Sequence, residues 1–320
     1  MSARIPLSLA ALTIGTLSGH AQEPFRAGTD IVPIYATVRG NDGHLVTDLE
    51  QSDFSVLDRG EPVPLALFSN EDQPLTVAVM VDLSGSVNAP WHVNLKQGLL
   101  AFVDALGPND RARIGSFTGG EIAVGFHLTS NRDELKRVVH EEILVPLTGG
   151  GVLWNAIGAA MDSLANEPGR RIVLMLTNST EDRSSLPGFP GARDVERYMQ
   201  TGNYMVYAVA LFEGNSAMRR ASSALNPPRL TLQDVVNTTG GGFFRALPGG
   251  PRQYWTGAPP EGYLAAKLAA VVDELRHQYL LGFVPRHRDG KVGRIEVRVN
   301  RPDATVIARR SYRAPSEGRR

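Results

Sequence analysis

The middle of the chain alternates short apolar runs with longer segments that are apolar on one side only. In the longer segments apolar residues stand three or four positions apart, which predicts amphipathic helices over Leu95–Leu106, Leu153–Leu164 and Leu264–Leu275. The short runs predict buried strands at Val77–Val81, Ala112–Phe117, Ile122–Phe126, Ile172–Leu176 and Met205–Leu211. Together they predict an α/β fold with a doubly wound, mostly parallel, Rossmann-like sheet.

The two ends of the chain follow another pattern, in which apolar residues alternate with other residues. This alternation runs from Ile34 to Val38 and again from Ile295 to Val299. A period of two predicts strands with one buried face. Because each end is small for an independent core, we expect the two ends to pair in one small β-sandwich-like module.

These patterns divide the chain into consecutive parts. We expect a signal peptide at 1–21, the first half of the β module at 28–74 and the α/β domain at 75–277. The second half of the β module follows at 278–315, and a disordered tail at 316–320.

The N-terminus has the features of a secretory signal peptide. Arg4 supplies a positive charge, and an apolar stretch runs from Ile5 to Leu17. The small residues Gly19 and Ala21 then stand at the spacing that signal peptidase requires. The alternative is a membrane anchor, but this stretch is too short to span a bilayer, and no other stretch is long enough. We therefore expect cleavage after Ala21 and a secreted or periplasmic protein without an integral membrane segment.

Composition narrows the choice of partners and chemistry. The 320 residues include 33 basic and 33 acidic side chains, so no charge excess points to nucleic acid or an anionic membrane. The chain has no cysteine, which excludes disulfides, thiol catalysis and Cys-ligated zinc, and leaves no lipobox cysteine for a lipid anchor.

The stretch VAVMVDLSGSVNAP places polar side chains where a buried strand ends. Asp82, Ser84 and Ser86 form a D-x-S-x-S pattern between this strand and the next helix. In an open α/β sheet, ligands bind beyond the carboxyl ends of the strands. One carboxylate and two hydroxyls are hard oxygen ligands that suit Mg²⁺. The alternative is an ordinary turn and helix cap, because Asp, Ser and Gly are common turn residues.

With these surroundings, Leu75–His277 resembles a von Willebrand factor type A domain. The flanking stretches SDFSVLDRGEPVPLALFSNEDQPLTVAVMVDLSGSV and LRHQYLLGFVPRHRDGKVGRIEVRVNRP resemble a group of bacterial exported proteins called VWFA-related. The resemblance implies that D-x-S-x-S belongs to a metal-ion-dependent adhesion site. In that site a Gly-Gly-Thr loop adds a hydroxyl and an Asp after the fourth core strand adds a carboxylate. The carboxylate of a protein ligand then fills the open metal position.

The sequence departs from this family pattern in the loops that complete the site. The loop GGGVLWN has Gly151 in place of the Thr and Asn155 in place of a loop Asp, and Asn178 replaces the Asp after the fourth strand. Because ligand charge strongly tunes ion affinity, we expect Mg²⁺ or Mn²⁺ to bind weakly or not at all. The predicted metal ligands are Asp82, Ser84, Ser86 and Asn178. The alternative is an inherited fold in which Asp82 bonds Ser84, Ser86 or backbone amides instead of a metal ion.

Residues around this site are predicted to contact a ligand. Glu181 and Asp182 stand in the same loop as Asn178 and are candidate substitute ligands. Phe189 lies in LPGFPG, where Pro and Gly disfavour a regular element, so we expect its side chain to be exposed. Trp154 has two interpretations, core packing or stacking on a ligand. The predicted ligand-binding set is Gly150, Gly151, Trp154, Glu181, Asp182 and Phe189.

The sequence therefore predicts a non-enzymatic binding or adhesion module that contacts a protein or an extracellular polymer. A metal-independent structural or assembly protein of the cell envelope is the main alternative. A serine hydrolase with Ser84 as nucleophile is a remote one, because G-x-S-x-G is absent. His140 begins an H-E pair, but Leu144 stands at the second zinc-ligand position, which excludes that metalloprotease motif.

Overall fold

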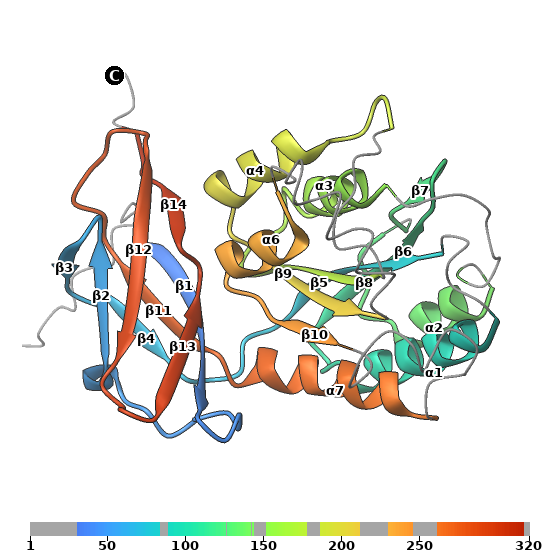
Figure 1. The fold of residues 1–320 in the computed structure, drawn as a ribbon, viewed down its shortest axis with the longest axis horizontal. Coiled ribbons are helices and arrows are strands. Elements are labelled where there is room, and N and C mark those ends of the chain that lie inside the picture. Colours follow the sequence, from blue (N-terminus) through green and yellow to red (C-terminus); the bar gives the residue numbers. More distant parts are fainter. Residues whose placement is uncertain are drawn as a thin grey trace, which may run out of the picture.

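The computed structural model describes residues 31–83, 89–125, 127–141, 143, 152–177, 186–211, 230–245 and 261–316. These residues form two units that lie side by side, an α/β unit and a β module (Figure 1). In the described parts of the chain, no helix is both long and apolar enough to cross a membrane.

The α/β unit is built on a six-stranded sheet with the order β10-β9-β8-β5-β6-β7. Its neighbouring strands are parallel except for β7, which pairs antiparallel with β6. The strands are β5 (Thr76–Asp82), β6 (Arg111–Phe117), β7 (Ile122–Ala123), β8 (Arg171–Thr177), β9 (Tyr204–Ala210) and β10 (Phe243–Arg245). The predicted strand at Ile122–Phe126 is therefore shorter in its described part, and Phe126 lies outside the described residues.

Helices cover both faces of this sheet. One face carries α1 (Ala89–Ala105), α2 (Arg132–Glu141) and α7 (Tyr263–Arg276), and the other carries α3 (Leu153–Ser163), α4 (Ala192–Thr201) and α6 (Leu232–Thr239). The predicted doubly wound fold class is confirmed. The sequence analysis did not predict α2, α4 or α6, which are short helices with two, two and four buried residues.

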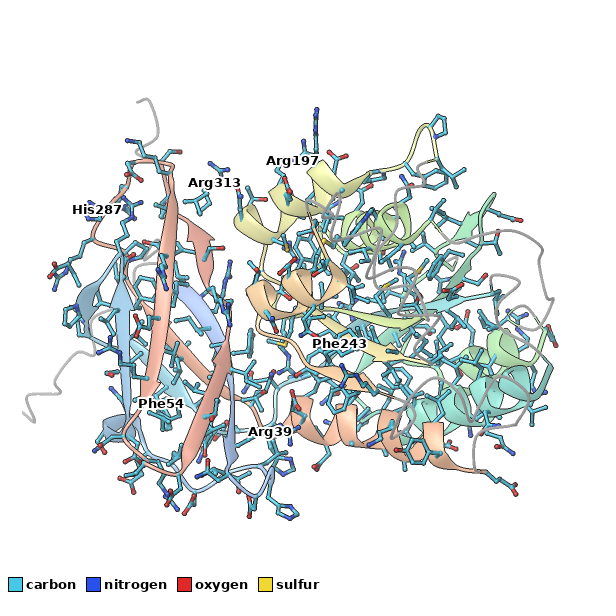
Figure 2. The ribbon with its side chains drawn as sticks, in the orientation of Figure 1. Arg39, Phe54, Arg197, Phe243, His287 and Arg313 are labelled. Carbon is cyan, nitrogen blue, oxygen red and sulfur yellow. The ribbon has the colours of Figure 1, made fainter. Side chains whose placement is uncertain are left out.

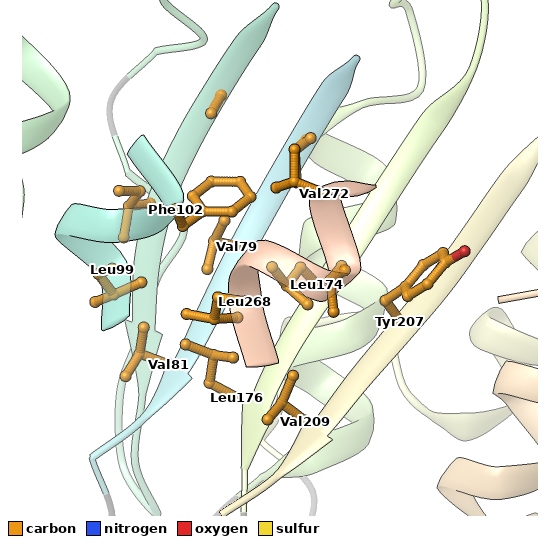
Figure 3. Close-up of a cluster of buried hydrophobic side chains, with 14 of the residues drawn as sticks. Val79, Val81, Leu99, Phe102, Leu174, Leu176, Tyr207, Val209, Leu268 and Val272 are labelled. Carbon is orange, nitrogen blue, oxygen red and sulfur yellow. The ribbon is translucent and has the colours of Figure 1, made fainter. Parts of the chain in front are cut away.

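Successive side chains of β5 point to opposite faces of the sheet and pack into the core on each face. Val79 and Val81 pack with Leu99 and Phe102 of α1 and with Leu268 of α7 (Figure 3). Ala78 and Met80 point to the opposite face and pack against α3 and α4. Every residue of β5 is buried, and the sequence of the strand is accordingly a continuous apolar run, Val77–Val81, followed by Asp82.

The β module consists of two four-stranded sheets, each built from both ends of the chain, as predicted. One sheet has the order β13-β1-β11-β4 and the other β14-β12-β2-β3. A 3-10 turn, η1 (Gln51–Asp53), precedes β2. The strands are β1 (Val32–Gly40), β2 (Phe54–Asp58), β3 (Glu61–Val63), β4 (Leu67–Ser69), β11 (Tyr279–Phe283), β12 (Val292–Val299), β13 (Ala304–Ala308) and β14 (Ser311–Arg313).

The C-terminal stretch TVIARRSY divides between the two sheets at Arg309 and Arg310. The Arg309 guanidinium turns toward the α/β unit and donates to Gly202 O at 3.2 Å and Asn203 Oδ1 at 3.3 Å. Its burial lowers the pKa of Arg309 to about 10. β13 pairs with β1 in one sheet and β14 pairs with β12 in the other, so the stretch forms two strands and not one.

β1 is buried on both of its faces and joins the two units. Its even-numbered residues Ile34, Ala36 and Val38 pack in the core of the β module. On the opposite face, Tyr35 packs with the core of the α/β unit, and Arg39 forms an ion pair with Glu274 of α7. Figure 2 shows Arg39 beside the end of this helix. The alternating residues of β1 therefore pack into two different cores, one on each face of the strand.

A buried hydrogen-bond network connects the two units at their boundary. Glu274, 1% exposed, accepts from Tyr207 Oη at 2.7 Å and from Thr37 Oγ1 at 3.3 Å, in addition to its ion pair with Arg39. Gln278 donates to Thr37 Oγ1 at 2.9 Å and accepts from Arg170 Nη1 at 2.7 Å. Burial, and then the charge of Glu274, raise the pKa of Tyr207, so its hydroxyl remains a neutral donor.

Candidate functional site

The carboxyl ends of β5 and β8 bring Asp82 and Thr177 together. These strands are parallel neighbours, so their last residues meet at the same edge of the sheet. Thr177 Oγ1 donates to Asp82 Oδ2 at 2.7 Å. Both residues are buried, Asp82 with none of its surface exposed. The carboxylate is therefore held in place by a hydroxyl that the sequence analysis did not single out.

The described donors at this edge only partly fit a divalent cation. Carboxylate and hydroxyl oxygens are the ligand types that Mg²⁺ and Mn²⁺ take. However, in the described part of the chain no three His, Asp or Glu residues come close enough together to hold a metal ion. Among the described residues at this edge, Asp82 contributes one negative charge and Thr177 one hydroxyl oxygen.

Most of the other predicted site residues lie outside the described residues. These residues are Ser84, Ser86, Gly150, Gly151, Asn178, Glu181 and Asp182. In the sequence, Ser84 and Ser86 follow β5, and Gly150 and Gly151 precede α3. The other three residues follow β8. Their roles stay predictions from the sequence.

Asn155 of α3 anchors the segment that follows these loops. Its side chain has none of its surface exposed, and its Oδ1 accepts from Leu186 N at 2.9 Å. Its Nδ2 lies within donor distance of Pro190 O at 3.0 Å, Phe189 O at 3.3 Å and Leu186 O at 3.4 Å. An amide supplies both the donor and the acceptor that this backbone requires, which a carboxylate cannot do.

Gly158 lies one turn after Asn155 and lets the same segment approach the helix. A Cβ at this position would lie 2.7 Å from Pro190 Cβ and 2.9 Å from Pro190 O, closer than such atoms come in proteins. The helix therefore accepts a glycine in its interior because a side chain there would displace the segment. The sequence signal was a glycine and an amide within the otherwise apolar run Leu153–Met161, and the sequence analysis did not use it.

Trp154 and Phe189 lie in different environments. Trp154 is 5% exposed and packs in the core between the sheet and α3. This burial agrees with its core-packing interpretation. Phe189 is 41% exposed, as the sequence predicts for LPGFPG, and the Asn155 contacts hold its backbone. Phe189 is thus an exposed aromatic side chain on an anchored segment.

Solved structures similar to this chain include type A domains. A von Willebrand factor type A protein from Catenulispora acidiphila has a TM-score of 0.47 and 12% identity, covering 92% of this chain and 76% of that one. An aerotolerance-related membrane protein from Bacteroides fragilis has a TM-score of 0.41 and 16% identity, covering 63% and 98%. The vWF domain of the type V pili tip protein Mfa5 from Porphyromonas gingivalis has a TM-score of 0.42 and 12% identity, covering 64% and 94%.

No protein-family model matches the chain, and no curated protein is similar to it in sequence. The three structural similarities concern the fold. The strand order and the helical layers of this chain are those of a Rossmann-like sheet, the fold that the resemblance to type A domains implies.

Proposed function

We propose that this protein is a non-enzymatic binding module that contacts a protein or an extracellular polymer through the carboxyl-end edge of its parallel sheet. The observation that carries the proposal is the buried Asp82 carboxylate at the end of β5, held by Thr177 of the neighbouring strand. An acid in this place lies where open α/β sheets bind their ligands. The exposed Phe189, whose backbone Asn155 of α3 holds, offers an additional apolar contact.

In this proposal the site is a degenerate metal-ion-dependent adhesion site. Asp82, Ser84, Ser86 and Asn178 would hold Mg²⁺ or Mn²⁺, and the ion would offer an open position to a carboxylate of the partner. The hydroxyl of Thr177 orients the Asp82 carboxylate. Because the predicted ligand set has one carboxylate, the affinity for either ion is expected to be low.

Restoring the two missing ligands is expected to strengthen ion binding at least about tenfold, because a second carboxylate and a third hydroxyl join the site. The variant carries Gly151→Thr and Asn178→Asp, and calorimetric titration with Mn²⁺ compares it with the parent. Adding Asp82→Asn to this variant is the control and should abolish the gain. Equal Mn²⁺ binding by the parent and the double variant would show that Gly151 and Asn178 do not occupy the predicted positions.

One observation favours a metal-independent assembly protein as the second candidate. The hydrogen bond from Thr177 satisfies one oxygen of Asp82 without any ion. The two candidates separate in a pull-down from the envelope of the exporting cell, performed with and without a chelator. A partner that is retained in the presence of the chelator supports the assembly protein.

We also propose that the protein is secreted or periplasmic. The basis is the charged, apolar and small-residue pattern of residues 1–21. N-terminal sequencing of the protein from its native source should begin at Gln22. An intact Met1 on protein from the cytoplasm would contradict export.

A further inference from the structure

A groove runs along the boundary between the two units. Its volume is 460 Å³, in the range of small binding sites. One wall is formed by α6, the turn after it and β10, and the other wall by β13 and Arg310. Asp82, Thr177 and Phe189, the described residues of the proposed carboxyl-end site, do not line this groove.

Both walls of the groove contain the last strand of a sheet. Among the described strands, β10 is the edge strand of the six-stranded sheet, and β13 is the edge strand of one sheet of the β module. The groove is lined by the consecutive residues Thr305, Val306, Ile307 and Ala308. Since side chains in a strand alternate between its two faces, contact with consecutive residues means that the groove meets β13 along its edge.

The pairing of β13 with β1 leaves the backbone of Val306 facing away from β1. Asn41 faces Asp303 across the two strands, and Asn41 N donates to Asp303 O, so this is a hydrogen-bonded pair. Along an antiparallel ladder, hydrogen-bonded pairs alternate with pairs that are not hydrogen-bonded. The pair of Val38 with Val306 is then not hydrogen-bonded. Consistently, Val38 O accepts from Val46 N on the other side of β1. Among the described residues, neither N–H nor C=O of Val306 has a hydrogen-bond partner.

The charge of the groove indicates what it accepts. Arg245 and Arg310 line it together with the amides Gln233 and Asn237. Within the described parts of the chain, no aspartate or glutamate lines the groove. The Arg310 side chain is exposed and has no ion-pair partner among the described residues. An acidic ligand is therefore favoured over a basic one.

We propose that an extended, acidic segment of a partner protein binds in this groove by adding as a strand to the free edge of β13. The alternating N–H and C=O groups of a strand edge are complementary to another peptide backbone. The five residues of β13 span about 17 Å, so the added segment has about five residues. Acidic side chains of the segment pair with Arg310. This partner contact is separate from the carboxyl-end site.

A synthetic probe tests the proposal on the full chain. The probe is a short, capped peptide of alternating valine and glutamate, and the same peptide with lysine in place of glutamate is its charge control. The readouts are the hydrogen-exchange rate of the Val306 amide and the fluorescence anisotropy of a labelled peptide. The valine–glutamate peptide should slow exchange at Val306, and the valine–lysine peptide should leave it unchanged.

Two matched pairs of variants localise the binding. Val306→Pro removes the N–H that faces the groove and that the β1–β13 ladder does not use, while Val306→Ala keeps it. Arg310→Glu reverses the charge at the groove, while Arg294→Glu makes the same change at an exposed position of β12. Val306→Pro and Arg310→Glu should each weaken binding about tenfold relative to their controls. If Val306→Pro does not fold, the arginine pair decides.

Several results would overturn the proposal. One is unchanged exchange at Val306 in millimolar valine–glutamate peptide, and another is equal binding by the variants and their controls. Protection of Val306 that rises with protein concentration in the absence of peptide would assign the edge to a second copy of the chain instead. Asp82→Asn should leave peptide binding unchanged, so failure of the carboxyl-end site and failure of this groove are distinguishable.

Discussion

Replacing Glu274 with alanine is expected to lower the free energy of unfolding by about 3 kcal/mol or more. Glu274 is 1% exposed and receives hydrogen bonds from Tyr207 and Thr37 and an ion pair from Arg39. Without the carboxylate, the Tyr207 and Thr37 hydroxyls lose an acceptor inside the protein, and the Arg39 charge loses its counter-ion. Breaking a buried pair by removing one partner is costly because the other partner stays behind.

The same substitution should also weaken the coupling between the two units. Glu274 belongs to α7 of the α/β unit, whereas Thr37 and Arg39 belong to β1 of the β module. We expect the parent to unfold in one transition and Glu274→Ala to unfold in two, or over a broader range of denaturant. Urea unfolding followed by circular dichroism and by tryptophan fluorescence measures both effects.

A matched control separates burial from charge. Glu296 pairs with Arg298 at 2.7 Å on the exposed side of β12, and both side chains are about half exposed or more. Glu296→Ala removes the same number of atoms and the same charge, and it should change stability little because exposed ion pairs contribute little. Equal losses from Glu274→Ala and Glu296→Ala would contradict the proposed role of the buried network.

The sequence predicted the central strands β5, β8 and β9 of the α/β unit well because their burial on both faces leaves a local signature. Every residue of β5 is buried, so Val77–Val81 reads as an unbroken apolar run. The pairing of the two chain ends also followed from a physical requirement, since neither end forms a sheet with a complete core by itself. The apolar run of a buried strand depends on residues that are close in sequence, and the pairing of the two chain ends depends on the size of each segment.

The boundary between the units could not be predicted in the same way. Thr37 and Arg39 appear in the sequence as the polar positions of an alternating strand, a pattern that is typical of a wet face. Their partner Glu274 stands more than two hundred residues later, at a position of α7 that the helical period alone does not distinguish. Long-range polar pairs of this kind leave no spacing that a single sequence reveals.

The candidate site was predictable only in part, for a related reason. Asp82 was identified because it ends an apolar strand, and its place at the carboxyl-end edge follows from the parallel sheet. Thr177 was not identified, although it ends the neighbouring strand β8 in the same way. Its hydroxyl becomes meaningful only when β5 and β8 are known to be neighbours, and strand order is a property of the whole sheet.

Replacing Asn155 with aspartate is expected to lower the free energy of unfolding at pH 7 by about 3 kcal/mol. This substitution introduces the residue type that the resemblance to type A domains implies at this place, yet the structure disfavours it here. Asn155 Nδ2 lies 3.0 Å from Pro190 O and 3.3 Å from Phe189 O. An ionised carboxylate would place a negative oxygen against these carbonyl oxygens in a site with no exposed surface.

The effect should depend on pH in a direction that identifies its cause. Burial and the facing carbonyl groups disfavour the charged form, so the pKa of the introduced aspartate is raised in the folded state above about 3.9. A raised pKa means that folding is supported below the unfolded pKa and is weakened as pH rises through the folded pKa. The variant should therefore approach the parent near pH 4, where its protonated hydroxyl donates to one carbonyl, and fall behind at pH 7.

Asn131→Asp provides the matched control for this prediction. Asn131 precedes α2 on the surface, and its Oδ1 only accepts, from Asp133 N at 3.0 Å and Glu134 N at 3.2 Å. Asp serves as well as Asn at such a helix cap, so this variant should unfold like the parent at pH 7. Urea unfolding of the parent and both variants at pH 4 and pH 7 completes the test. If Asn155→Asp is as stable as Asn131→Asp at pH 7, the amide of Asn155 does not anchor the segment that carries Phe189.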